Sequence, residues 1–83
     1  MNSSVAPEFW ALFNRLPPQL QAQARKQFSL WLDDHWHPSL HFKKVGAYCS
    51  VRVDANHRAL GVERDGSILW FFIGPHDAYE GQI

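Results

Sequence analysis

The stretch that decides the fold is LHFKKVGAYCSVRV, residues 40–53. Apolar and polar side chains alternate in its two parts, 40–45 and 48–53, and Gly46 lies between them. Alternation with a period of two is typical of strands that bury one face, and a glycine between two such runs favours a turn. The stretch therefore predicts two antiparallel strands.

Two further strands follow this pair. Residues 54–56 form a short hairpin loop before a strand at 57–63, and Asp65-Gly66 is a tight-turn signal before a strand at 67–73. The last strand is apolar on both faces, as expected of a central strand or of one covered by a partner. Gly74-Pro75 ends it, and residues 75–83 are expected to form a short terminal turn.

Before residue 40, the apolar residues recur at helical spacing. A first helix is expected at about 7–15, with Ser3 or Ser4 as its cap, and Pro17-Pro18 separates it from a second helix. The expected apolar stripes are Phe9, Leu12, Phe13 and Leu16 in the first helix, and Leu20, Ala24, Phe28 and Trp31 or Leu32 in the second.

These elements fit a single domain, because the 83 residues are too few for two separate interiors. The order of two helices and then four strands predicts an α+β fold. We expect an N-terminal helical hairpin, at about 7–35, packed on one face of a four-stranded antiparallel meander sheet, at about 40–74.

Composition indicates a cytoplasmic protein. The N-terminus has neither the basic nor the apolar region of a secretory signal, and the longest apolar run, 68–73, is far too short to cross a membrane. Cys49 is the single cysteine, which excludes an internal disulfide. Its inward strand position favours a buried thiol that packs rather than reacts.

Metal and cofactor sites are not expected. His35, His37 and His41 resemble metal-ligand spacing, but Pro38 and a change from helix to strand separate them, and no second cluster completes a tetrahedral set.

Charge is balanced overall, with eight basic and eight acidic residues, but it is unevenly distributed. Pleating sends Cys49, Val51 and Val53 to the face that the helices are expected to cover. The other face then collects cationic and aromatic side chains without a carboxylate, where the ordinary alternative is a solvated sheet surface. Its expected members are His41, Lys43, Tyr48, Ser50 and Arg52, joined by Arg58 if the strand register permits.

Four motifs in order resemble those of the RelE/ParE superfamily of toxins from toxin–antitoxin systems. They are HPSLHFKKVG, YCSVRV, NHRALG and ILWFFIGPHDAYE, which together run from residue 37 to residue 80. The helical hairpin before them also agrees in type and length, so the resemblance covers nearly the whole chain.

The resemblance implies a toxin that binds a cognate antitoxin. The apolar run at 68–73 favours a central core strand, and the alternative is that an antitoxin segment covers apolar surface on or beside it. For RelE-like members the resemblance also implies metal-independent, ribosome-dependent cleavage of mRNA that inhibits translation. Carried onto this sequence, it implies the following site. Arg52, Arg58, His76 and Tyr79 are the expected catalytic residues, and Lys43, Lys44, His41 and Tyr48 are the expected RNA-binding residues.

The sequence departs from RelE-like toxins in two respects. The chain is neutral where those toxins are generally basic, and its C-terminal region has His76 and Asp77 where they carry an arginine. The alternative is therefore a non-enzymatic protein, either a ParE-like inhibitor of DNA gyrase or a degenerate toxin that only binds its antitoxin. A third reading is a general α+β interaction module.

Overall fold

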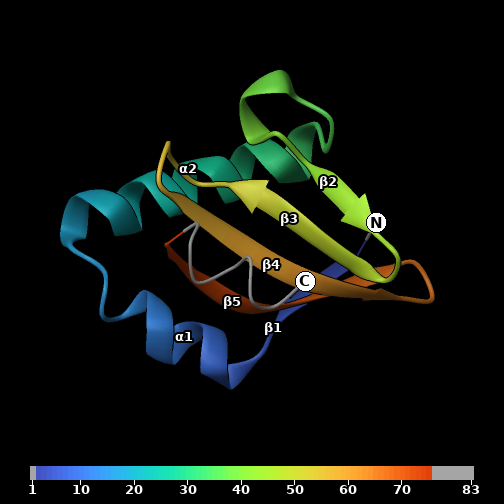
Figure 1. The fold of residues 1–83 in the computed structure, drawn as a ribbon, viewed down its shortest axis with the longest axis horizontal. Helices are drawn as coiled ribbons and strands as arrows, with labels where there is room; N and C mark the ends of the chain where they lie inside the picture. Colours follow the sequence, from blue (N-terminus) through green and yellow to red (C-terminus); the bar gives the residue numbers. More distant parts are fainter. Residues whose placement is uncertain (1, 76–83) are drawn as a thin grey trace.

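Within residues 2–75, which the computed structural model describes, the sheet has five strands, one more than the sequence predicted. The strand order is β1-β5-β4-β3-β2, and Figure 1 shows the sheet below helix α2. Strands β2 to β5 form the expected antiparallel meander, whereas β1 pairs in parallel with β5. The strands are β1 (Asn2–Val5), β2 (Lys43–Val45), β3 (Tyr48–Arg52), β4 (His57–Arg64) and β5 (Ser67–Pro75).

Strand β1 corrects the prediction that Ser3 or Ser4 caps the first helix. Both serines lie in β1, and the helix begins after Ala6, which makes no side-chain capping bond. Pairing continues past the strand, since the Ala6 N–H donates to the Trp70 carbonyl at 2.9 Å. The short, polar stretch NSSV has no period-two alternation. It forms a strand because it pairs with the free edge of β5. This pairing makes β5 an internal strand, in accord with its two apolar faces.

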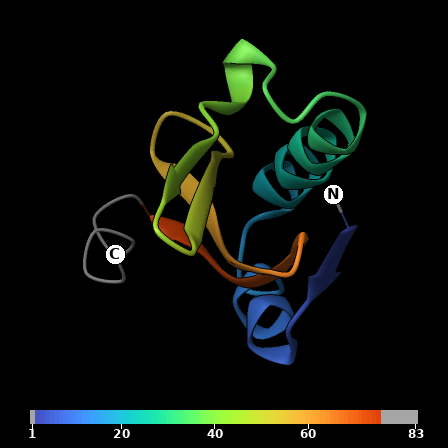
Figure 2. The same ribbon diagram turned by 90° about the vertical axis from the view of Figure 1, so that its right-hand side faces the viewer.

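Both helices lie on one side of the sheet, as Figure 2 shows. Helix α1 (Pro7–Phe13) is shorter than expected, and α2 (Pro18–Asp33) covers its predicted range. The hairpin is open, with an apolar groove between the two helices above the sheet. The buried stripe of α2 contains the expected Leu20, Ala24 and Trp31, and also Gln27, which was not expected. Phe28, which was expected in the stripe, is 38% exposed, and Leu32, the alternative to Trp31, is 53% exposed.

Of the predicted strand at 40–45, only residues 43–45 form a strand. Leu40 instead ends a 3-10 helix, η1 (Pro38–Leu40). This helix forms because the ring of Pro38 favours a helical first turn, and the His37 Nδ1 accepts the Ser39 N–H at 3.2 Å. His41 then takes a left-handed conformation, with φ of 45°. This turn shortens β2 to three residues and sets the direction of the His41 side chain.

Two apolar clusters form the core between the sheet and the helices. At Gly61 the side chains of Ile68 and Trp70 pack directly against the backbone of β4. A Cβ at this position would lie 2.6 Å from Ile68 Cγ2 and 3.0 Å from Trp70 Cε3. The first cluster contains Trp31, Leu40, Phe42, Cys49, Val51, Ile68 and Trp70, and the second contains Phe13, Leu20, Ala24, Val53 and Ile73.

Candidate nucleic-acid interface

Arg52 and Arg58 are direct cross-strand neighbours. Arg52 ends β3 and pairs in register with Arg58 on β4, so their Cα atoms are about 4.5–5.5 Å apart and their side chains leave the same face. Because Cys49 and Val51 are buried in the core under the helices, the alternate residues of β3 point the other way. We call the face that carries Arg52 and Arg58 the outer face.

His41 contacts Arg52 from the turn before β2. The His41 Nε2 lies 3.2 Å from the Arg52 Nη1, and the Arg52 Nε donates to the Asp54 carbonyl at 3.3 Å. A guanidinium has only donors, so the His41 Nε2 must accept, which requires a neutral ring protonated at Nδ1. Two contacts therefore hold the Arg52 guanidinium at the end of its strand.

Lys43 shares the outer face. It pairs in register with Ser50, which alternates with Arg52 on β3, and its side chain is exposed. We call Lys43, Arg52 and Arg58, together with the neutral His41 ring that contacts Arg52, the cationic cluster. Within residues 2–75, no carboxylate forms an ion pair with Arg52. Since like charges directly opposite each other on adjacent strands repel, an anion such as a phosphate would be stabilised here.

Tyr48 extends the outer face towards the other end of β3. Its side chain is 40% exposed, and its ring meets that of Phe71 edge-to-face, with centroids 6.2 Å apart. Ser50, between Tyr48 and Arg52, was expected on an open face but is only 1% exposed, and within residues 2–75 its hydroxyl has no hydrogen-bond partner. The outer face thus carries aromatic surface at one end and cationic groups at the other.

Lys44 is not brought together with the cationic cluster. It pairs in register with Cys49, so it leaves the opposite face, and its Nζ lies 2.7 Å from the Glu63 Oε1. Burial, and then the nearby Glu63 carboxylate, raise the pKa of the Cys49 thiol to about 11, which the Lys44 charge partly offsets. Lys44 therefore belongs to an ion pair beside a buried thiol, not to the outer face.

His76 and Tyr79, the other two expected catalytic residues, lie outside the residues that the structure describes.

The sequence did not predict the hydrogen-bonded pair of Asp54, in the loop between β3 and β4, and His57, the first residue of β4. The His57 Nδ1 is 2.9 Å from the Asp54 Oδ1, which also accepts the Asn56 N–H at 2.8 Å. Burial raises the Asp54 pKa, but the bonds from Asn56 and His57 outweigh it and lower that pKa below its usual value. The signal was the spacing Asp-x-Asn-His, because aspartate often bonds to the backbone two residues on.

The described residues contain neither a metal-binding cluster nor a membrane-spanning helix. The described part of the chain has no group of three or more His, Cys, Asp or Glu placed to hold a metal ion. None of its helices is both long enough and apolar enough to cross a membrane.

Comparisons with known proteins connect this geometry to a fold family. The sequence matches no protein-family model and no curated protein. Among solved structures, it is similar to a chain of the RelB–RelE antitoxin–toxin complex from Methanococcus jannaschii, with a TM-score of 0.72 and 12% identity over 95% of this chain and 96% of that one. The YoeB/ParE toxin from Agrobacterium tumefaciens gives a TM-score of 0.70 and 13% identity, over 92% and 99%.

A chain of the RelBE2 toxin–antitoxin complex from Mycobacterium tuberculosis gives a TM-score of 0.64 and 15% identity, over 90% of this chain and 96% of that one. The chain has the fold of the RelE/ParE toxins. The similarity spans nearly all of each protein.

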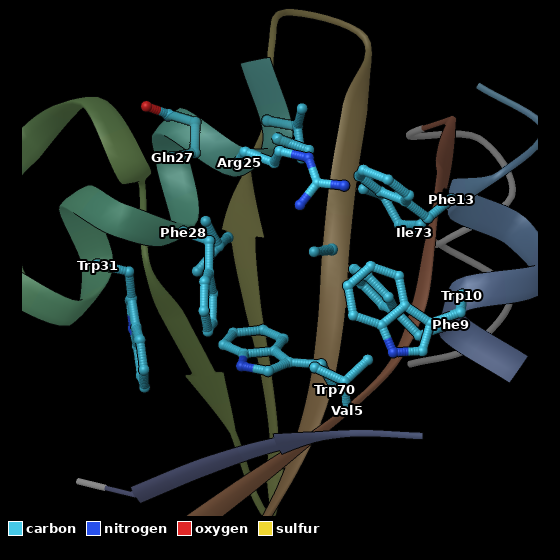
Figure 3. A pocket seen from close by; sticks show the side chains of 14 residues that line it. Val5, Phe9, Trp10, Phe13, Arg25, Gln27, Phe28, Trp31, Trp70 and Ile73 are labelled. Carbon is cyan, nitrogen blue, oxygen red and sulfur yellow. The ribbon is translucent and has the colours of Figure 1, made fainter. Parts of the chain in front are cut away.

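This RelE/ParE-like fold also contains the apolar groove between α1 and α2, shown in Figure 3. The groove encloses about 130 Å³. Arg25 lies over the Phe13 ring, with its guanidinium carbon 5.0 Å from the ring centroid, and so links the two helices across one end of the groove. The groove lies on the helix side of the sheet and is separate from the outer face. Its walls include Phe9, Trp10 and Phe13 from α1, Gln27, Phe28 and Trp31 from α2, and Trp70 from β5.

Proposed function

We propose that this chain is the toxin of a type II toxin–antitoxin module, and that it cleaves ribosome-bound mRNA without a metal ion. The observation that carries this proposal is the cross-strand pair Arg52 and Arg58, with His41 against Arg52, on the face of the sheet away from the helices. The RelE/ParE-like fold and the four sequence motifs support it.

The proposed reaction needs charge stabilisation and two proton transfers. The ribose 2′-oxygen attacks the adjacent phosphorus, a 2′,3′-cyclic phosphate forms, and the bond to the 5′-oxygen breaks. A base removes the 2′-hydroxyl proton and an acid protonates the leaving 5′-oxygen. Negative charge grows on the phosphorane in between, and guanidinium groups fixed beside it lower its energy.

The cationic cluster is suited to the charge stabilisation. A guanidinium is a planar fork that can match two phosphate oxygens, and Lys43 adds a charge on the same face as Arg52 and Arg58. We assign the phosphate-facing role to these three residues, with His41 and Tyr48 contacting the RNA beside them. Lys44 is left out because its ammonium pairs with Glu63.

Proton transfer is assigned to the C-terminal region. An imidazole ionises near neutrality and can act as acid or base, so His76 is proposed for one proton transfer, and Tyr79 is proposed to stack on a base or to assist the transfer. Both assignments follow from the sequence motif alone.

The proposed partners are an antitoxin, the ribosome and mRNA, which would place the protein in the cytoplasm. Two of the similar solved structures are toxin–antitoxin complexes, which supports an antitoxin partner. In such a module, the antitoxin would be encoded by the neighbouring reading frame.

Expression of the chain with and without that neighbour tests the proposal. We expect growth arrest and new transcript ends inside open reading frames when the chain is expressed alone, and neither when the antitoxin is present. Arg52→Ala and His76→Ala should abolish the new ends. Intact transcripts with loss of plasmid supercoiling would instead identify a gyrase inhibitor, and intact transcripts with normal growth would identify a degenerate toxin or a simple binding module.

A further inference from the structure

Gln27 is a buried polar residue in an otherwise apolar helix face. It is 6% exposed and lies in α2 between Ala24 and Trp31. Its amide Nε2 donates to two main-chain carbonyls, that of Arg52 at 2.9 Å and that of Ser39 at 3.3 Å. In Figure 3 its amide points away from the middle of the groove. Burying an amide is unfavourable unless it is hydrogen-bonded, and here each of its two hydrogens has an acceptor.

The two carbonyls belong to the segments whose side chains meet on the outer face. Arg52 is the last residue of β3, and Ser39 lies in η1 two positions before His41. The side chains of His41 and Arg52 are in contact at 3.2 Å. The same turn is also held by Leu40, which is buried in the core, and by the bond from the His41 N–H to the Pro38 carbonyl at 3.3 Å. Gln27 therefore joins, from the helix side, the two backbones that carry this pair.

We propose that Gln27 is a positioning residue for the cationic cluster. By holding the Ser39 and Arg52 carbonyls on one amide, it fixes the His41 ring against the Arg52 guanidinium, and so sets the direction in which Arg52 meets a phosphate. The RNA part of this inference rests on the proposed function, whereas the link from Gln27 to His41 does not. The hydrogen bonds of the Gln27 amide go to main-chain carbonyls, so it acts on this pair through the backbone.

A matched control lies one turn earlier on the same helix. The Gln23 Nε2 donates to the Val53 carbonyl at 3.0 Å, so it also ties α2 to the end of β3. Unlike Gln27, it makes no bond to η1. Gln23→Met and Gln27→Met remove the same kind of donor at nearly constant volume, but only the second releases the turn that carries His41.

The experiment compares wild type, Gln27→Met and Gln23→Met by two measurements. Nitrogen NMR of the His41 ring reports its tautomer, and fluorescence anisotropy with a 2′-O-methyl RNA oligonucleotide reports binding without cleavage. We expect a single Nδ1–H tautomer in wild type and Gln23→Met, and averaging of the two tautomers in Gln27→Met. RNA affinity should fall roughly 3- to 10-fold in Gln27→Met, as expected when the single hydrogen bond between His41 and Arg52 is lost, and change less than about twofold in Gln23→Met.

An unchanged His41 tautomer in Gln27→Met would overturn the inference, as would equal losses of affinity in the two variants. If Gln27→Met does not fold, Gln27→Asn replaces it, because this shorter amide keeps its donors but cannot reach both carbonyls. A wild type that binds no RNA while its His41 tautomer still depends on Gln27 would contradict the proposed function and leave the positioning role standing.

Discussion

Arg52 and Arg58 face each other across β3 and β4 as paired residues, on the face of the sheet opposite the buried Cys49 and Val51. Like charges directly opposite each other on adjacent strands repel unless other groups compensate them. The pair places two basic residues side by side on a chain whose net charge is zero. A neutral protein can thus present a local site for an anion.

RNA affinity should depend on Arg52 and not on Lys44. We expect Arg52→Ala to weaken binding of a single-stranded oligonucleotide, and to reduce the slope of log affinity against log salt by about 0.7, the value for one phosphate contact. Lys44→Ala, which removes an equal charge that pairs with Glu63, should leave the slope unchanged. Anisotropy titrations at several salt concentrations measure both. Equal effects of the two substitutions would contradict a site on the outer face.

The Cys49 thiol should be unreactive in the folded protein. Burial, followed by the Glu63 charge, raises its pKa from 9.0 to about 11, which lowers its thiolate fraction at pH 8 by roughly 100-fold. Alkylation by iodoacetamide should therefore be slow in buffer and fast in denaturant, where the ordinary pKa returns. Equal rates under the two conditions would show that the thiol is not buried.

Gly61→Ala should destabilise the fold through crowding. The added methyl would lie 2.6 Å from Ile68 Cγ2, and overpacking of this kind costs about 1–3 kcal/mol. Gly46→Asn is the control, because Gly46 has open space around it and a φ of 61° that asparagine tolerates. Thermal unfolding should show a clear fall in melting temperature for Gly61→Ala and a smaller fall for Gly46→Asn. A larger fall for Gly46→Asn would contradict the close packing of Gly61 against Ile68 and Trp70 of β5.

Asp54 should contribute charge-dependent stability at neutral pH. Because its pKa is lowered in the folded state, the contribution is present above the unfolded pKa of about 3.9 and is lost as the pH falls through the folded value. The effect should be small, since the side chain is partly exposed. Wild type should exceed Asp54→Asn in chemical stability at pH 7, and the difference should shrink as the pH falls below the unfolded pKa of about 3.9. A difference that does not change with pH would exclude the carboxylate charge as its source.

The antiparallel meander and the two helices were predictable because their signals are local. Period-two alternation in residues 48–53, the Asp65-Gly66 turn and the Pro17-Pro18 break each depend on a few neighbouring residues. The face of Arg52 followed from the same alternation. Pairing of Arg58 with Arg52 required the strand register, which depends on contacts between strands.

Other features could not be read from the sequence because distant contacts determine them. Strand β1 forms by pairing with β5. Gln27 can be buried because its amide donates hydrogen bonds to two main-chain carbonyls. His41 turns towards Arg52 through a left-handed backbone that alternation does not encode. Lys44 was assigned to RNA binding through the family resemblance, whereas pleating places it on the opposite face from Lys43.

Mapping of mRNA ends in a reconstituted translation system, with purified protein, tests the central claim most directly. The account predicts discrete cuts within ribosome-bound mRNA, no cuts when ribosomes are omitted, and loss of cutting in Arg52→Ala with retention in Lys44→Ala. Message that stays intact on the ribosome, or that Arg52→Ala cuts as well as wild type, would contradict it.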